Sequence, residues 1–94
     1  MERKKLSSEE VEAALEGLAR WKVDNDRLKR RFAFSNFAES LAFVNKVGEA
    51  AEALDHHPDI KMGWGYAEIE TTTHDRSGIT DMDFELARKI NELT

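Results

Sequence analysis

The sequence contains no cysteine, one proline and no long apolar run. Without cysteine the chain cannot form disulfides, thiolate nucleophiles, or cysteine-ligated zinc and iron–sulfur sites. No apolar stretch approaches the roughly 20 residues that span a bilayer, and the polar start lacks the apolar segment of a signal peptide. These absences predict a cytoplasmic protein with no direct membrane contact.

Positive charge is also scarce, since 14 lysines and arginines face 19 acidic residues for a net charge of −5. A nucleic-acid surface needs a basic face, so this balance argues against direct nucleic-acid binding. Arg27, Lys29, Arg30 and Arg31 form a local exception, which we interpret as a charged guard on the edge of a sheet. The composition, 40% hydrophobic and 35% charged, is typical of a globular protein, and residues 1–94 are expected to form one domain.

Two segments carry complete helix-start signals. Ser7 with Glu10 three residues later forms a capping box, which predicts a helix from about Ser8 to Ala19. Thr80 with Asp83 forms a second capping box and predicts a C-terminal helix. Capping alone accounts for Asp83, so no catalytic role is assigned to it.

A longer helix is predicted between these two. Its cap is Ser35 or Asn36, and it should end near Asp55 or His56 because Pro58 cannot continue a helix.

The apolar positions of this long helix spread over roughly 160° of the helical wheel, which is wider than one core-facing stripe requires. We therefore expect one side to meet the sheet and the other to meet a partner subunit, in a homodimer or homotetramer. Gly48 lies in mid-helix, where glycine is unfavourable, and close approach of another backbone is its expected reason.

The segments between the helices are predicted to be strands. Trp21–Val23 and Leu28–Phe34 flank a polar turn, which predicts a hairpin. Gly63–Thr73 is rich in aromatic and β-branched residues and is predicted to be a strand; alternatively the chain reverses before it, giving a short strand before Gly63 and a longer one after Gly65. The order α-β-β-α-β-β-α predicts an α+β fold, a four-stranded antiparallel sheet with three helices packed on one face.

All three histidines lie between Glu52 and His74, and this stretch is the candidate site. His56 and His57 stand where the long helix must stop, with Glu52 and Asp55 within about one turn. Histidines beside carboxylates suit proton transfer. Two other interpretations remain open: the histidines could only cap the helix and fill a turn, or they could bind a metal ion with a carboxylate. Adjacent histidines rarely reach one ion, and no H-x-x-x-H spacing is present.

Aromatic residues could wall a pocket for a flat ring system. Trp64 and Tyr66 follow the histidine pair closely, and Trp21 could join them from across the sheet, although its default place is the core.

The spaced pattern of Glu52, His56-His57-Pro58, Trp64, His74 and Asp83 resembles the signature of the pterin-4a-carbinolamine dehydratases, also known as dimerisation cofactors of a homeodomain transcription factor. The similarity covers nearly the whole chain. It implies the same α+β sandwich, and dehydration of 4a-hydroxytetrahydropterin, such as 4a-hydroxytetrahydrobiopterin, to quinonoid dihydropterin and water. No metal or organic cofactor is implied. The partners implied are a reduced pterin, further copies of the chain, and an aromatic amino acid hydroxylase in pterin recycling.

The resemblance also implies roles for single residues. His56 and His74 fall on the acid–base histidines, and His57 falls on the histidine that binds and orients the pterin. Glu52 matches a carboxylate that contacts the pterin or tunes the histidines. The other positions expected to contact substrate are Asp55, Pro58, Trp64, Thr72, Thr73 and Trp21.

The chain departs from the family pattern at residues 62–65, where relatives usually carry fewer glycines and a tyrosine in place of Trp64. An alternative function is an oligomerisation or binding module that acts as a partner of another protein, such as a transcription factor.

Overall fold

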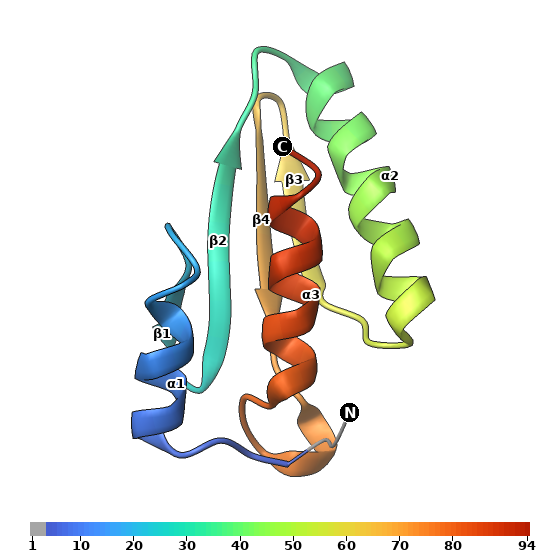
Figure 1. Cartoon of the computed structure of the whole chain (residues 1–94). Helices are drawn as coiled ribbons and strands as arrows, with labels where there is room; N and C mark the ends of the chain where they lie inside the picture. Colours follow the sequence, from blue (N-terminus) through green and yellow to red (C-terminus); the bar gives the residue numbers. More distant parts are fainter. Residues whose placement is uncertain (1–3) are drawn as a thin grey trace.

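The computed structural model describes residues 4–94 and contains one antiparallel sheet in the strand order β1-β2-β4-β3. Helices pack on one face of it (Figure 1), so the predicted α+β architecture is confirmed. The elements in chain order are α1 (Ser8–Leu15), β1 (Lys22–Asp24), β2 (Arg27–Ala33), α2 (Phe37–Leu54), β3 (Asp59–Gly63), β4 (Tyr66–Thr71), the short 3-10 helix η1 (His74–Arg76) and α3 (Asp81–Asn91).

Both predicted capping boxes are present. The Ser7 hydroxyl and the Glu10 carboxylate exchange hydrogen bonds with each other's backbone N–H at the start of α1. Thr80 and Asp83 do the same at the start of α3. The expected end of the first helix is wrong, because α1 stops at Leu15 instead of Ala19. Gly17 follows the C-cap residue Glu16, and glycine disfavours continuing the helix.

Helix α2 begins and ends close to its predicted limits. Asn36 is the N-cap and accepts from the backbone N–H of Glu39 at 2.9 Å. The Glu39 carboxylate accepts from the backbone N–H of Ser35. At the other end Asp55 adopts a left-handed conformation with φ of 52°, which breaks the helical path three residues before Pro58.

Two tight hairpin turns set the register of the sheet. Asn25 and Asp26 both have positive φ values, 54° and 60°, which gives the turn between β1 and β2 the twist that suits a two-residue hairpin. Trp64 and Gly65 form the turn between β3 and β4, with Gly65 at φ 78°. The chain reversal near Gly63 is therefore the correct alternative, and a single strand over Gly63–Thr73 is wrong.

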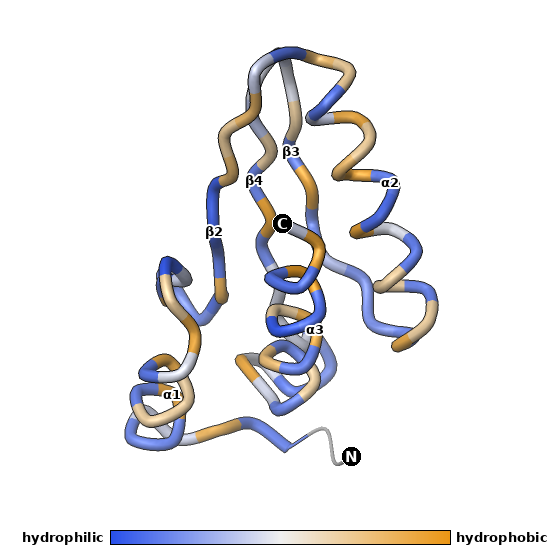
Figure 2. The backbone as a smooth tube through the Cα atoms, turned by 45° about the horizontal axis from the view of Figure 1, so that its top comes forward, coloured by the Kyte–Doolittle hydropathy of each residue, from blue (hydrophilic) through white to orange (hydrophobic). Residues whose placement is uncertain are grey.

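The core lies between the sheet and the helices. Alternate residues of β2 and β4 face it, because successive side chains of a strand point to opposite faces. In Figure 2 apolar and polar positions alternate along α2 and α3, as expected for helices that cover a sheet with one face. Within residues 4–94 no helix has the length and apolarity needed to cross a membrane. Buried core residues include Leu28, Phe32, Phe43, Val47, Ala67, Ile69, Phe84, Leu86 and Ile90.

The opposite face of the sheet is charged. Strand β2 lies between β1 and β4, so its basic residues do not guard an edge, and that interpretation is wrong. Side chains of β2 there pair with acidic neighbours on adjacent strands, as in the bond from Arg31 to Glu68 at 3.1 Å. We call this surface the open face.

Candidate active site

His56 is buried at the point where α2 ends. Its backbone N–H donates to the carbonyl of Ala51, which continues the hydrogen bonding of the helix past Asp55. The imidazole is only 5% exposed, and its Nε2 lies 2.6 Å from Oδ1 of Asp83. Because an ionised carboxylate can only accept, Nε2 carries a proton, and Nδ1 is the second nitrogen of the ring.

Asp83 is fully buried and receives four hydrogen bonds. Its Oδ1 accepts from His56 and from the Thr71 hydroxyl, each at 2.6 Å. Its Oδ2 accepts from the Thr73 hydroxyl and from the backbone N–H of Thr80, each at 2.9 Å. Such bonds offset the desolvation of a buried carboxylate. The capping role assigned to Asp83 is therefore correct but incomplete, because this side chain also holds His56.

Thr71 and Thr73 both donate from their hydroxyls to Asp83. The sequence pattern predicted a role for Thr73, as a substrate contact, but not for Thr71. Both are buried, although Thr73 follows the end of β4. They lie two residues apart and so face the same side of an extended chain. Two hydroxyl groups that face the core need a hydrogen-bond acceptor. Their spacing in the sequence could therefore have predicted a buried acceptor side chain.

His57 forms a second imidazole–carboxylate pair. Its Nε2 is hydrogen-bonded to Oε2 of Glu52, and both side chains are more than half exposed. Asp55, which lies between them in sequence, is exposed and serves as the helix C-cap. Pro58 is half-buried and leads into β3. The end of α2 thus presents one buried and one exposed histidine, each bonded to a carboxylate.

His74 is exposed and begins η1. The residue before it, Thr73, is anchored to Asp83 through its hydroxyl and to Gly78 through a β-bridge. Thr72 is half-buried and donates from its hydroxyl to the carbonyl of Asp26 at 2.9 Å. In Figure 1 the segment after β4 lies at the same end of the sheet as the end of α2. All three histidines therefore belong to one end of the molecule.

The two tryptophans lie elsewhere within this chain. Trp64 sits in the β3–β4 turn, at the end of the hairpin opposite to the histidines, and is 72% exposed. Trp21 is buried beside Phe32 and donates from Nε1 to Oδ1 of Asn91. The expected aromatic wall beside the histidines is not formed by either side chain here, because the hairpin reverses at Trp64 and carries it to the far end.

The chemistry available at this end of the sheet is proton transfer and hydrogen bonding. Among residues 4–94 no group of three or more histidine, aspartate and glutamate side chains is placed as metal ligands would be. Two imidazoles, each with Nε2 tied to a carboxylate, leave Nδ1 of each ring for proton exchange.

Comparison with known proteins identifies the family. Residues 4–93 match the family described as Pterin 4 alpha carbinolamine dehydratase. A relative from Rubrobacter xylanophilus, provisionally named as a pterin-4-alpha-carbinolamine dehydratase, is 49% identical over 89 residues, which cover 94% of this chain and 83% of the relative. The crystal structure of a transcriptional coactivator/pterin dehydratase from Brucella melitensis is similar with a TM-score of 0.91 and 32% identity, covering 96% of this chain and 98% of that one.

A more distant structure shares the fold alone. It is a pterin dehydratase-like protein described as a RuBisCO assembly factor in the alpha-carboxysome, with a TM-score of 0.64 and 24% identity over 79% of this chain and 86% of that one. The match over nearly the full length and the identity to the relatives agree with the fold. The chain belongs to the pterin-4-alpha-carbinolamine dehydratase family.

Proposed function

We propose that this chain is a hydro-lyase that dehydrates 4a-hydroxytetrahydropterin to quinonoid dihydropterin and water by histidine acid–base catalysis. One observation carries the proposal: two neighbouring imidazoles at the end of α2 are each hydrogen-bonded through Nε2 to a carboxylate, at the same end of the sheet as the segment that bears His74. Such pairs fix the ring orientation and the site of the proton, as proton transfer requires. Family membership supports the same reaction class.

The reaction needs one proton delivered and one removed. The hydroxyl leaves as water after it takes a proton, and a pterin ring nitrogen loses a proton as the quinonoid double bond forms. We assign these transfers to His56 and His74, and the orientation of the pterin to His57 with Glu52. Thr72 and Thr73 precede His74, and we assign their backbone to contact the pterin edge. The reaction requires no cofactor, and the proposed setting is cytoplasmic pterin recycling beside an aromatic amino acid hydroxylase.

The decisive experiment follows the decay of a freshly generated 4a-hydroxypterin by absorbance. The wild-type chain should accelerate the decay over buffer, and the double variant His56→Ala/His74→Ala should lose about 10²- to 10⁴-fold of that acceleration. Because His56 is buried, circular dichroism must show that the variant is folded. His74 is exposed, so His74→Ala alone keeps the test decisive. No acceleration by the wild type, or full activity in the double variant, would reject the proposal.

The exposed pair offers a control with matched charge. Glu52→Gln removes the carboxylate that holds His57, and it should slow the reaction by weakening substrate orientation. Glu49→Gln makes the same chemical change on the same helix, where the side chain is exposed. Equal rates in the two variants would show that the His57–Glu52 pair plays no part.

A second candidate function, a binding module, is favoured by the surface of α2. Phe37 and Leu41 are 47% and 41% exposed, and they lie four residues apart on one side of the helix. Val44 and Gly48 continue this stripe. Large exposed apolar side chains in a row indicate contact with another protein surface, here a second copy of the chain. The similar protein from Brucella melitensis is described as a transcriptional coactivator as well as a pterin dehydratase.

Analytical ultracentrifugation tests this candidate separately from the enzyme assay. The wild-type chain should sediment as a dimer or tetramer at micromolar concentration, and Leu41→Glu should shift it towards monomer. Ala42→Glu adds the same charge to an exposed position on another side of α2 and should leave the association unchanged. A wild-type chain that is only monomeric would reject the binding module and leave the dehydratase proposal standing.

A further inference from the structure

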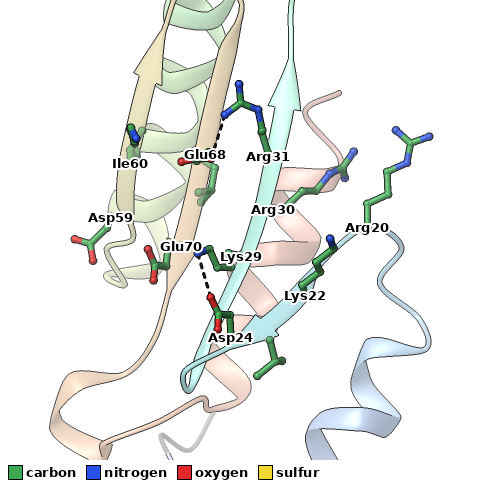
Figure 3. Close-up of a pocket in the computed structure, with 13 residues that line it drawn as sticks. Arg20, Lys22, Asp24, Lys29, Arg30, Arg31, Asp59, Ile60, Glu68 and Glu70 are labelled. Carbon is green, nitrogen blue, oxygen red and sulfur yellow. Dashed lines mark hydrogen bonds and ion pairs between the residues drawn. The ribbon is translucent and has the colours of Figure 1, made fainter.

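The open face of the sheet contains a broad depression of about 830 Å³, lined by the strands and by the segment before β1 (Figure 3). Most charges around it are neutralised by neighbours. The ion pairs are Arg27 with Asp59 at 3.3 Å and with Glu70 at 3.5 Å, Lys29 with Asp24 at 3.5 Å, and Arg31 with Glu68 at 3.1 Å.

Three basic side chains beside β1 lack such partners. Lys22 lies on the open face with its register partner Lys29, whereas Arg30, opposite the buried Ile69 and beyond the start of β1, is on the helix-covered face. Among residues 4–94, no carboxylate lies within ion-pair distance of Arg20, Lys22 or Arg30. Figure 3 shows these side chains extending in the same direction from three adjacent backbone segments. A chain with a net charge of −5 thus keeps a local excess of positive charge. We call Arg20, Lys22 and Arg30 the basic cluster.

Arg30 is fixed in place but its charge is not balanced. Its Nη1 donates to Oδ1 of Asn91 at 2.7 Å, and its guanidinium carbon lies 4.1 Å from the centre of the Phe32 ring. Asn91 is neutral, and the same oxygen also accepts from Trp21. The Nε atom of Arg30 is buried and has no hydrogen-bond partner among the described residues. Burial lowers the pKa of Arg30, and the charge of Arg20 lowers that pKa further.

The fold brings like charges together at this edge. Strand β1 begins at Lys22, which pairs in register with Lys29 of β2, so two ammonium-bearing side chains stand opposite each other. The chain just before β1 carries Arg20 to the side of Arg30. Opposed like charges are unfavourable between neighbouring strands. Asp24 already pairs with Lys29, so a bound anion would balance Lys22 and relieve the repulsion between Arg20 and Arg30.

We propose that the basic cluster is a binding site for a phosphate dianion, either inorganic phosphate or the phosphate group of a small phosphorylated molecule. Arg20 offers the planar donor pair of a guanidinium, Arg30 offers its remaining Nη2 group, and Lys22 offers a point charge, and phosphate oxygens accept from all three. A dianion balances this charge better than a single carboxylate does. Asn91 and Phe32 already fix the Arg30 side chain, so anion binding costs little conformational entropy at that guanidinium group.

The test is an NMR titration of the full chain at constant ionic strength, following the arginine Nε–Hε and backbone amide signals of the cluster. Inorganic phosphate and adenosine monophosphate are the two phosphate arms, and acetate is the monoanion comparison. Saturable shifts at the cluster are expected with phosphate, with weaker or no binding of acetate. The tighter of the two phosphate ligands shows whether the source is the free ion or a phosphorylated molecule.

Variants connect the signal to the cluster. Arg20 has φ of 72°, a left-handed conformation that asparagine tolerates well, so Arg20→Asn removes the guanidinium without backbone strain. This variant and Lys22→Gln should each weaken phosphate binding, Arg20→Asn by at least about tenfold because it removes charged hydrogen bonds. Lys46→Gln removes one positive charge from an exposed position of α2 and should leave the affinity within experimental error.

Three outcomes would overturn the proposal. One is the absence of saturable shifts with either phosphate ligand. Another is equal loss of affinity in Arg20→Asn and Lys46→Gln, which would indicate general charge screening. The third is binding of a single-stranded oligonucleotide, with an affinity that falls steeply with salt, in the absence of phosphate binding, since this is the signature of a nucleic-acid surface.

Discussion

Replacing Asp83 with asparagine should destabilise the protein strongly. The side chain is fully buried and accepts from His56, Thr71, Thr73 and the backbone of Thr80. Asparagine has the same shape, but one of its two polar atoms is a donor. Whichever way the amide rotates, its NH₂ group must face two of the four donors.

The magnitude follows from which donors can adapt. A threonine hydroxyl can turn and accept from the NH₂ group, and neutral His56 can accept at Nε2 when its proton moves to Nδ1, whereas the backbone N–H of Thr80 can only donate. Hydrogen bonds to a charged group contribute roughly 1.5–3 kcal/mol each and neutral ones roughly 0.5–1.5 kcal/mol, and the variant leaves only neutral bonds at this position. We therefore expect Asp83→Asn to lower the free energy of unfolding by about 2–4 kcal/mol, a large part of the ~5–15 kcal/mol typical of a domain.

Urea denaturation followed by tryptophan fluorescence measures this loss. Trp21 is buried in the core, so its fluorescence changes when unfolding exposes it to water. Asp81→Asn is the matched control: it makes the same change in the first turn of the same helix, but at an exposed position. Asp81→Asn should lower the free energy of unfolding by no more than about 1 kcal/mol, because it removes one negative charge that interacts with the N-terminal end of the helix dipole. A loss below about 1 kcal/mol for Asp83→Asn, or equal losses in both variants, would refute the reasoning.

Two further predictions concern backbone and capping. Gly65→Ala should lower the free energy of unfolding by about 1–2 kcal/mol, because Gly65 has φ of 78° and a Cβ would lie 3.1 Å from the carbonyl oxygen of Phe34. Gly48→Ala should raise it by up to about 1 kcal/mol in urea titrations of dilute protein, since a Cβ there meets nothing within 4 Å; a loss instead would indicate that another chain's backbone approaches Gly48. Hydrogen bonds from Ser7 lower the pKa of Glu10 in the folded chain, so its contribution to the start of α1 is complete at neutral pH and is lost as the pH falls through that lowered pKa. Amide NMR signals of α1 should show this acid transition in the wild type and lack it in Glu10→Gln, and identical titrations would contradict the prediction.

Local signals made most of the fold predictable. Ser7 with Glu10 and Thr80 with Asp83 are spaced for contacts inside one helical turn, and both capping boxes form. The end of α2 near Asp55 follows from the proline nearby. These interactions depend on few residues, so the rest of the chain cannot easily override them.

The arrangement of the candidate site was less predictable, because it depends on contacts between distant segments. His56 and Asp83 are 27 residues apart, and nothing in the local pattern of either one indicates the other. The place of Trp64 depends on where the β3–β4 hairpin reverses. Aromatic residues are common within strands, so the presence of Trp64 did not indicate that the turn lies at this residue. A shift of the turn by a few residues decides whether this side chain lies near the histidines or at the other end of the sheet.

The buried carboxylate has a structural consequence for the function of the site. Asp83 joins the end of α2 through His56, the end of β4 through Thr71 and Thr73, and the start of α3 through its own cap. The bonds that orient the buried imidazole are therefore the bonds that hold three elements of the fold together. A loss of activity in a variant of this network reflects stability and chemistry at once. The exposed pair of His57 and Glu52 lies outside the network, as does the exposed ring of His74, so a change in rate in variants of these residues can be assigned to the chemistry alone.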